Sequence, residues 1–105
     1  MTDKIHAMSN VASTRNQTTR HYSLAELAEE AGVSVRTVRY YIAEGLLPPA
    51  HIAGARSSYT QAHLDRLRLI GQLKAAYLPL KEIRRRLAGL DDEEVHRLVT
   101  DMPAA

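Results

Sequence analysis

At 105 residues, the chain has room for one domain and its tails. It contains no cysteine, which excludes a disulfide, a thiolate metal site and a thiol redox switch and fits a reducing compartment. No stretch has the apolar length of a signal peptide core or a membrane span, so we expect a cytoplasmic protein without a membrane partner.

The net charge of +2 hides a strong segregation along the chain. Residues 33–88 hold 10 Lys and Arg against 3 Asp and Glu, a charge of +7, whereas residues 1–32 carry −1 and residues 89–105 carry −4. A polyanion is the natural partner of the basic segment, because each phosphate that it neutralises releases condensed counterions. Charge alone is a weak indicator of nucleic-acid binding, so this prediction also depends on the sequence motifs of the basic segment.

The first 20 residues are rich in Ser, Thr, Asn and Gln and show no periodic apolar pattern. Such a segment buries too little surface to offset the entropy of ordering it, so residues 1–20 are expected to form a disordered N-terminal arm. We expect the folded domain to cover residues 21–90.

Two short helices with a tight corner between them open this domain. Ser23 precedes Glu26 by three residues, the spacing of a capping box, and Gly32 supplies the left-handed residue that ends the first helix. Ser34 then caps a second helix over residues 35–44. The pair predicts a helix-turn-helix.

Helical spacing divides the second helix into two faces. Val38, Tyr41 and Ile42 fall on the inward face. The opposite face, which we call the reading face, consists of Arg36, Thr37, Arg39 and Tyr40. Two arginines beside a threonine and a tyrosine are suited to contact base edges and phosphates.

A small hairpin is expected after the second helix. Gly45 ends that helix and Pro48-Pro49 prevents its continuation, so the chain must extend. His51, Ile52 and Ala53 can then pair with residues 57–59 across a turn at Gly54-Ala55. Arg56 stands just past the tip, where its cation could reach a phosphate or a minor groove.

Thr60 can cap a third helix that runs to about Tyr77. The apolar face expected to form its core contact consists of Leu64, Leu67, Ile70, Gly71, Leu73 and Tyr77. Gly71 weakens a helix relative to alanine, so its presence predicts the close approach of another backbone.

Pro79 breaks this pattern and starts a fourth helix, in which Leu80, Ile83 and Leu87 point inward and Lys81 points away. The consecutive arginines 84–86 span most of a helical turn, so they cannot all face one ligand. One or two are expected to meet a nucleic acid, while another covers apolar surface with its stem.

Asp91 and Glu94 resemble a further helix start, so residues 91–105 are expected to form a short acidic amphipathic helix. Its apolar stripe consists of Val95, Leu98, Val99 and Met102. The stripe could complete the core of this domain or meet the same stripe of a second molecule as a dimerisation element.

Three blocks of this sequence resemble the DNA-binding domain of MerR-type transcriptional regulators: YSLAELAEEAGVSVRTVRYYIAEGLLPP, LDRLRLIGQLK and LPLKEI. The resemblance covers residue 22 to about residue 90. It implies a mainly α fold, a winged helix-turn-helix with a small β-hairpin wing and four to five helices. In such a fold the second helix enters the major groove, and wings near residues 54–59 and 78–81 clamp the backbone.

Functional residues carry over by the same resemblance. Arg36, Thr37, Arg39 and Tyr40 resemble recognition-helix contacts, Arg56 a first-wing contact and Lys81 a second-wing contact. The family binds double-stranded DNA as a homodimer on an inverted repeat and often acts on RNA polymerase at the promoter. The resemblance therefore implies a transcription regulator that is associated with the nucleoid when bound.

The sequence departs from the family pattern at three places. Arg56 lies one residue farther from Tyr59 than the usual wing arginine, and Pro79 replaces a common Ser or Thr. No long coiled-coil helix or effector domain follows in this sequence, so it is expected to be either a fragment of a longer regulator or a small stand-alone binder.

Two other functions compete with the regulator. An excisionase-like architectural protein would use the same winged helix to bend DNA, and an antirepressor-type module would bind a protein through residues 95–102. An enzyme is not expected, because no serine sits in a nucleophile elbow or beside a phosphate-binding glycine loop. The five histidines show no metal-ligand spacing, so neither a metal nor a cofactor is expected.

Overall fold

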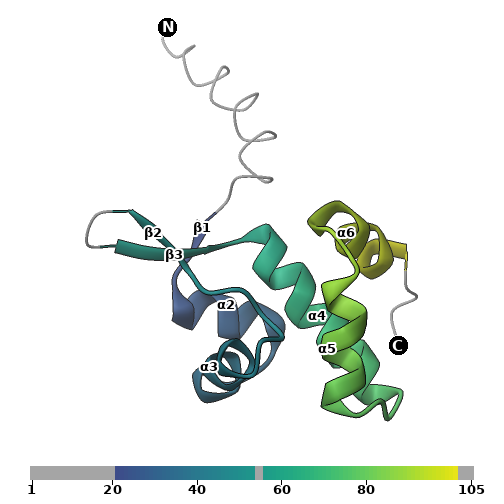
Figure 1. The fold of residues 1–105 in the computed structure, drawn as a ribbon. Helices are drawn as coiled ribbons and strands as arrows, with labels where there is room; N and C mark the ends of the chain where they lie inside the picture. Colours follow the sequence, from purple (N-terminus) through teal and green to yellow (C-terminus); the bar gives the residue numbers. More distant parts are fainter. Residues whose placement is uncertain (1–20, 54–55, 102–105) are drawn as a thin grey trace, which may run out of the picture.

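The structure, a computed structural model, describes residues 21–53 and 56–101 (Figure 1). The predicted arm, the predicted turn at Gly54-Ala55 and Met102 lie outside these residues. In chain order the elements are β1 (His21–Tyr22), α2 (Leu24–Ala31), α3 (Val35–Ala43), β2 (His51–Ala53), β3 (Arg56–Thr60), α4 (Gln61–Ala75), α5 (Leu80–Ala88) and α6 (Asp92–Asp101). Five helices and one small sheet in the described ranges confirm the predicted winged helix-turn-helix.

The caps predicted for the helix-turn-helix are present. The Ser23 and Glu26 side chains each accept from the other residue's backbone N–H, at 3.1 and 2.8 Å. Gly32 ends α2 in the left-handed conformation with φ 72°, which a residue with a Cβ adopts only at a steric cost. The Ser34 hydroxyl accepts from the Thr37 N–H at 3.0 Å and starts α3. Hydrogen bonds between residues three positions apart thus fix where both helices begin.

The sheet has three antiparallel strands in the order β1-β3-β2. The sequence did not predict β1, whose Tyr22 pairs with Tyr59 of β3. In the β2–β3 hairpin, Ala53 pairs with Arg56. Arg56 therefore belongs to the ladder, whereas the sequence placed it just past the tip of the hairpin.

One core joins all five helices of the described chain. Its fully buried side chains include Leu27 of α2, Val38 of α3, Leu64 and Ile70 of α4, Ile83 of α5 and Val95 of α6. The long helix α4 lies at the centre and packs against α2, α5 and α6. This scaffold fixes where α3 and the hairpin stand relative to each other.

Two predictions about the third helix are wrong. The helix ends at Ala75, and Tyr77 is 93% exposed in the corner that follows, because the chain turns before Pro79 and leaves the helical periodicity. Gly71 lies on the exposed side of α4. A Cβ at Gly71 would meet no heavy atom within 4 Å outside the backbone of its own helix, so no other backbone approaches it.

The C-terminal helix α6 completes the core of its own chain. Asp91 and Glu94 form the expected capping box, with hydrogen bonds of 2.8 and 2.9 Å. Val95 is fully buried and Val99 is partly buried against the core. Leu98 remains 41% exposed, so only part of the predicted apolar stripe is used within the chain.

Candidate nucleic-acid interface

The side chains of α3 are buried on one face and exposed on the other, as the helical spacing of the sequence predicts. Val38 and Tyr41 are buried, whereas Arg36 and Arg39 are exposed. Tyr40 is 47% exposed, and its ring tilts against that of Tyr41 with the centroids 6.0 Å apart. The reading face thus projects from a helix whose other side is fixed in the core.

Thr37 has a second role at the start of α3. It is half-buried, and its Oγ1 accepts a hydrogen bond from the Ser34 hydroxyl at 3.0 Å. The same serine accepts from the Thr37 N–H, so the first turn of α3 is held on two sides. This holds the residues at the N-terminal end of the helix in a fixed orientation.

Two long side chains from other helices hold the rest of α3. Lys74 of α4 donates from Nζ to the Tyr41 hydroxyl at 3.3 Å. Arg84 of α5 donates from Nε to the carbonyl oxygen of Glu44 at 2.8 Å and pairs with the Glu44 carboxylate at 3.4 Å. A cation at this end also complements the negative end of the α3 dipole. The sequence offered no signal for these contacts, because the partners are 33 and 40 residues apart.

The arginines at 84–86 do not supply free cations. Arg85 and Arg86 both bind Glu82, at 3.0 and 3.2 Å, while Arg84 binds Glu44. The hydrogen bonds from Arg85 and Arg86 lower the pKa of Glu82 below its ordinary value. The predicted contact of this run with a nucleic acid would have to compete with these internal pairs.

Few cations in the described ranges lack an internal partner. The Lys and Arg side chains that make no ion pair or hydrogen bond within these ranges are Arg36, Arg39, Arg68 and Lys81. Two of these lie on α3, and Lys81 lies exposed in the first turn of α5. Three of the predicted contact residues are therefore unpaired positive charges. The backbone of Arg56 lies in β3, but its side chain is outside what the structure describes.

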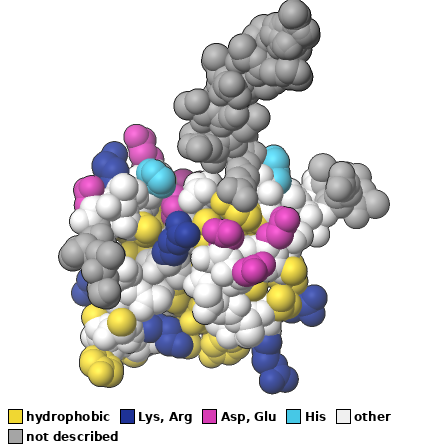
Figure 2. Space-filling view, turned by 180° about the vertical axis from the view of Figure 1, so that it is seen from behind, with side chains coloured by type: hydrophobic (Ala, Val, Ile, Leu, Met, Phe, Trp, Pro, Cys, Tyr) yellow, Lys and Arg dark blue, Asp and Glu magenta, His cyan; other side chains and the backbone are white. Residues whose placement is uncertain are grey.

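Figure 1 shows how the contact elements are arranged. Helix α3 and the corner between α4 and α5 lie along the lower side of the molecule, the hairpin extends to one side, and α6 lies at the opposite end. The charged side chains visible along the lower edge in Figure 2 are Lys and Arg, whereas the acidic ones on this face lie higher. This arrangement favours a polyanion on the α3 side.

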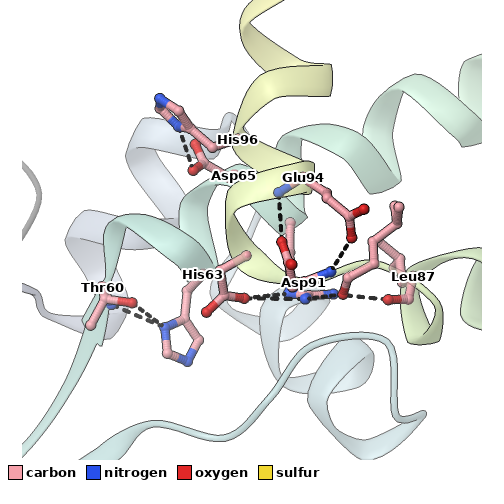
Figure 3. A network of polar contacts seen from close by, with 10 residues as sticks. Thr60, His63, Asp65, Leu87, Asp91, Glu94 and His96 are labelled. Carbon is pink, nitrogen blue, oxygen red and sulfur yellow. Dashed lines mark hydrogen bonds and ion pairs between the residues drawn. The ribbon is translucent and has the colours of Figure 1, made fainter.

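A buried histidine braces the base of the hairpin, a role that no signal in the sequence indicated. His63 Nδ1 accepts from the Thr60 N–H at 3.0 Å (Figure 3), and Nε2 donates to the Pro49 carbonyl at 3.0 Å. These partners fix the neutral tautomer, and burial lowers the pKa of His63 below its ordinary value of 6.5. The ring therefore ties the start of α4 to the segment that follows α3.

Polar groups of α4 also hold α6 in place (Figure 3). The buried Asp65 carboxylate contacts His96 Nδ1 at 2.8 Å and accepts from Gln61 at 3.0 Å. Arg66 donates to the Leu87 and Leu90 carbonyls at 3.2 and 2.9 Å and pairs with Asp92 at 3.1 Å. Arg66 thus joins the end of α5 to the start of α6.

Neither a metal site nor a membrane span is found in residues 21–53 and 56–101. No group of three or more metal-ligating side chains in these ranges could hold an ion. No helix in the same part of the chain has both the length and the apolar content needed to cross a bilayer.

Residues 22–90 match the family described as MerR HTH family regulatory protein. The chain is 42% identical over 79 residues to the HTH-type transcriptional regulator CueR of Bacillus subtilis, covering 69% of this chain and 55% of that protein. It is 34% identical over 74 residues to the mercuric resistance operon regulatory protein of Bacillus cereus, covering 70% and 56%. The chain therefore spans little more than half the length of these relatives.

Two solved structures share the fold. One is the transcription regulator PbrR691 from Ralstonia metallidurans CH34 in complex with lead(II), with TM-score 0.61, 39% identity and coverage of 75% of this chain and 66% of that one. The other is HiNmlR, a MerR family regulator lacking the sensor domain, bound to promoter DNA, with TM-score 0.59, 33% identity and coverage of 76% and 67%. Because the relatives are transcriptional regulators and not enzymes, the expectation of a non-enzymatic protein is confirmed.

Proposed function

Because the chain belongs to the MerR HTH family of regulatory proteins, we propose that it binds promoter DNA in the cytoplasm and regulates transcription. The observation that supports this proposal most strongly is that Arg36 and Arg39 are exposed and unpaired. They lie on a helix whose opposite side is held by hydrogen bonds from α4 and α5. A cation without an internal partner can bind a phosphate or base without first breaking an ion pair. The DNA-bound structure of HiNmlR supports the same assignment.

In the proposed complex α3 enters the major groove. Arg36 or Thr37, near its N-terminal end, reads base edges, and an arginine that makes two hydrogen bonds to a guanine is worth about 1–3 kcal/mol of discrimination. Arg39 and Tyr40 hold the phosphate backbone. Arg56 on the hairpin and Lys81 at the start of α5 are the wing contacts.

One recognition helix reads only a few base pairs, so useful specificity requires two half-sites. We therefore propose a homodimer on an inverted repeat, positioned to act on RNA polymerase at the promoter. Helix α6 is the proposed dimerisation element, since Leu98 is an apolar side chain that its own core leaves exposed. An inverted repeat in sequences that the chain selects from a random duplex pool would agree with this symmetry.

The salt dependence of duplex binding tests the proposed DNA contact. Fluorescence anisotropy would be measured on labelled duplexes of about 30 base pairs, long enough for two half-sites. Arg39→Ala should weaken binding to every duplex and reduce the slope of log K against log salt by roughly 0.9 for each phosphate that the variant no longer neutralises. Arg68→Ala is the matched control, because Arg68 is also exposed and unpaired but lies on α4. Equal slopes for Arg39→Ala and the wild-type chain would refute the contact.

A further inference from the structure

Tyr77 combines two properties that a folded chain rarely gives to one aromatic residue. It is 93% exposed, and among the described residues it is the one non-glycine with positive φ, at 66°. A bulky residue in the left-handed region is strained by its own Cβ. The exposed ring gains little from the core that could offset this strain.

The turn itself does not require a tyrosine. The Tyr77 N–H donates to the Lys74 carbonyl at 2.9 Å, and the Leu78 N–H donates to the Leu73 carbonyl at 3.2 Å. These two bonds form a Schellman motif, in which glycine is the usual residue at the Tyr77 position. Leu73 and Leu78 both pack against the core and anchor the motif. Glycine at position 77 would therefore form the same turn without strain. The fold does not account for the tyrosine side chain, which leaves a contact with another molecule to explain it.

A hydrogen bond connects the start of this corner to the inner side of α3. Lys74, one turn earlier, donates to the hydroxyl of Tyr41, whose ring packs against the exposed Tyr40. Four residues after Tyr77, the unpaired Lys81 lies in the first turn of α5. Figure 1 shows α3 and this corner on the same lower side of the molecule. A duplex seated on α3 would therefore run past Tyr77.

We propose that Tyr77 is a further DNA-contact residue, with its ring against a deoxyribose and its hydroxyl donating to a phosphate beyond the bases that α3 reads. The inference rests on the proposed function. Tyrosine hydroxyls are among the groups that bind phosphate oxygens, and such contacts position the protein without reading sequence. Because the side chain is neutral, the contact strengthens binding without releasing a further counterion.

Tyr77→Gly and Tyr77→Asn separate this role from folding, because both residues tolerate the left-handed conformation and lack the ring. Each variant should keep or raise the thermal midpoint and weaken binding to all labelled duplexes of about 30 base pairs. The expected loss is about three- to tenfold, the range of one net hydrogen bond, with an unchanged salt slope. Ala76→Gly is the matched control, since it loosens the same exposed corner and keeps the tyrosine.

Four results would overturn the proposal. If both Tyr77 variants bind as tightly as the wild-type chain, the ring makes no contact, and the proposed function stands without it. If the thermal midpoint of the Tyr77 variants falls along with their affinity, the tyrosine stabilises the fold. The same conclusion follows if Ala76→Gly loses as much affinity as they do. If the wild-type chain binds no duplex, the proposed function fails as well.

Discussion

On the side where α4 meets α6, charged and polar side chains bind one another, whereas the arginines of α3 bind none of the residues that the structure describes. Asp65 of α4 binds Gln61 and His96, and Arg66 binds the carbonyls of Leu87 and Leu90. Arg36 and Arg39 make no such contact in the described ranges. One region therefore stabilises the fold, and the other leaves its positive charge without a partner among the described residues.

Arg84 lies between these two regions. It belongs to α5 of the scaffold, but its guanidinium caps the last turn of the recognition helix. A cation that has no evident partner in the sequence thus holds the C-terminal end of α3. Substitutions in the scaffold should therefore change stability first, and substitutions on the reading face should change binding alone.

The largest effect is expected in the scaffold core. Ile83→Ala removes a fully buried side chain of α5 and leaves a cavity, so the free energy of unfolding should fall by about 2–5 kcal/mol. Urea unfolding followed by circular dichroism measures this loss. Ile52→Ala is the matched control, because this isoleucine of β2 is 72% exposed, and it should cost much less. Equal losses for the two variants would contradict the division of the molecule into core and surface.

A smaller, pH-dependent effect is expected at His63. Burial lowers its pKa below 6.5, so in acid the unfolded chain binds a proton that the folded chain excludes. Stability should therefore fall as the pH drops below about 6.5 and level off below the folded pKa. Thermal midpoints measured between about pH 7.5 and 5.5 test this.

His63→Gln cannot titrate and should flatten that part of the pH profile. Its midpoint at neutral pH should also be lower, because leaving the Thr60 N–H and the Pro49 carbonyl without partners costs about 1–3 kcal/mol. The assignment fails if the profiles of the wild-type chain and His63→Gln are parallel.

The smallest change in stability is expected at the boundary between the two regions. Arg84→Ala should lower the free energy of unfolding by only about 1 kcal/mol, because the side chain is partly exposed. It should nevertheless weaken duplex binding, since the end of α3 is no longer clamped. Arg85→Ala removes a more exposed arginine of the same helix, whose partner is Glu82, and should change neither quantity measurably. Identical duplex affinities for the two variants would show that Arg84 does not position α3.

Local signals in the sequence predicted most of the helices. The Ser23–Glu26 and Asp91–Glu94 pairs are capping boxes in the structure, and helical spacing alone placed Tyr40 outside and Tyr41 inside. Such signals work because the interacting groups are three or four residues apart. The prediction that α6 could serve its own core is likewise met by the buried Val95.

Contacts between distant segments could not be predicted in this way. No local pattern predicted strand β1, because its Tyr22 pairs with Tyr59 of a hairpin that is remote in the sequence. The arginine run was ambiguous for the same reason, since the Glu44 partner of Arg84 is remote in sequence. Tyr77 fitted the apolar period of the third helix, but the Schellman motif before Pro79 ended the helix first.

An NMR titration tests the central claim most directly. The amide signals of the ¹⁵N-labelled chain would be followed as an unlabelled duplex is added. The largest shifts are predicted at Arg36, Arg39 and Tyr40, with smaller ones at Lys81 and little change around Arg68 of α4. Shifts concentrated in α6, with the signals of α3 unmoved, would contradict the assignment of the reading face.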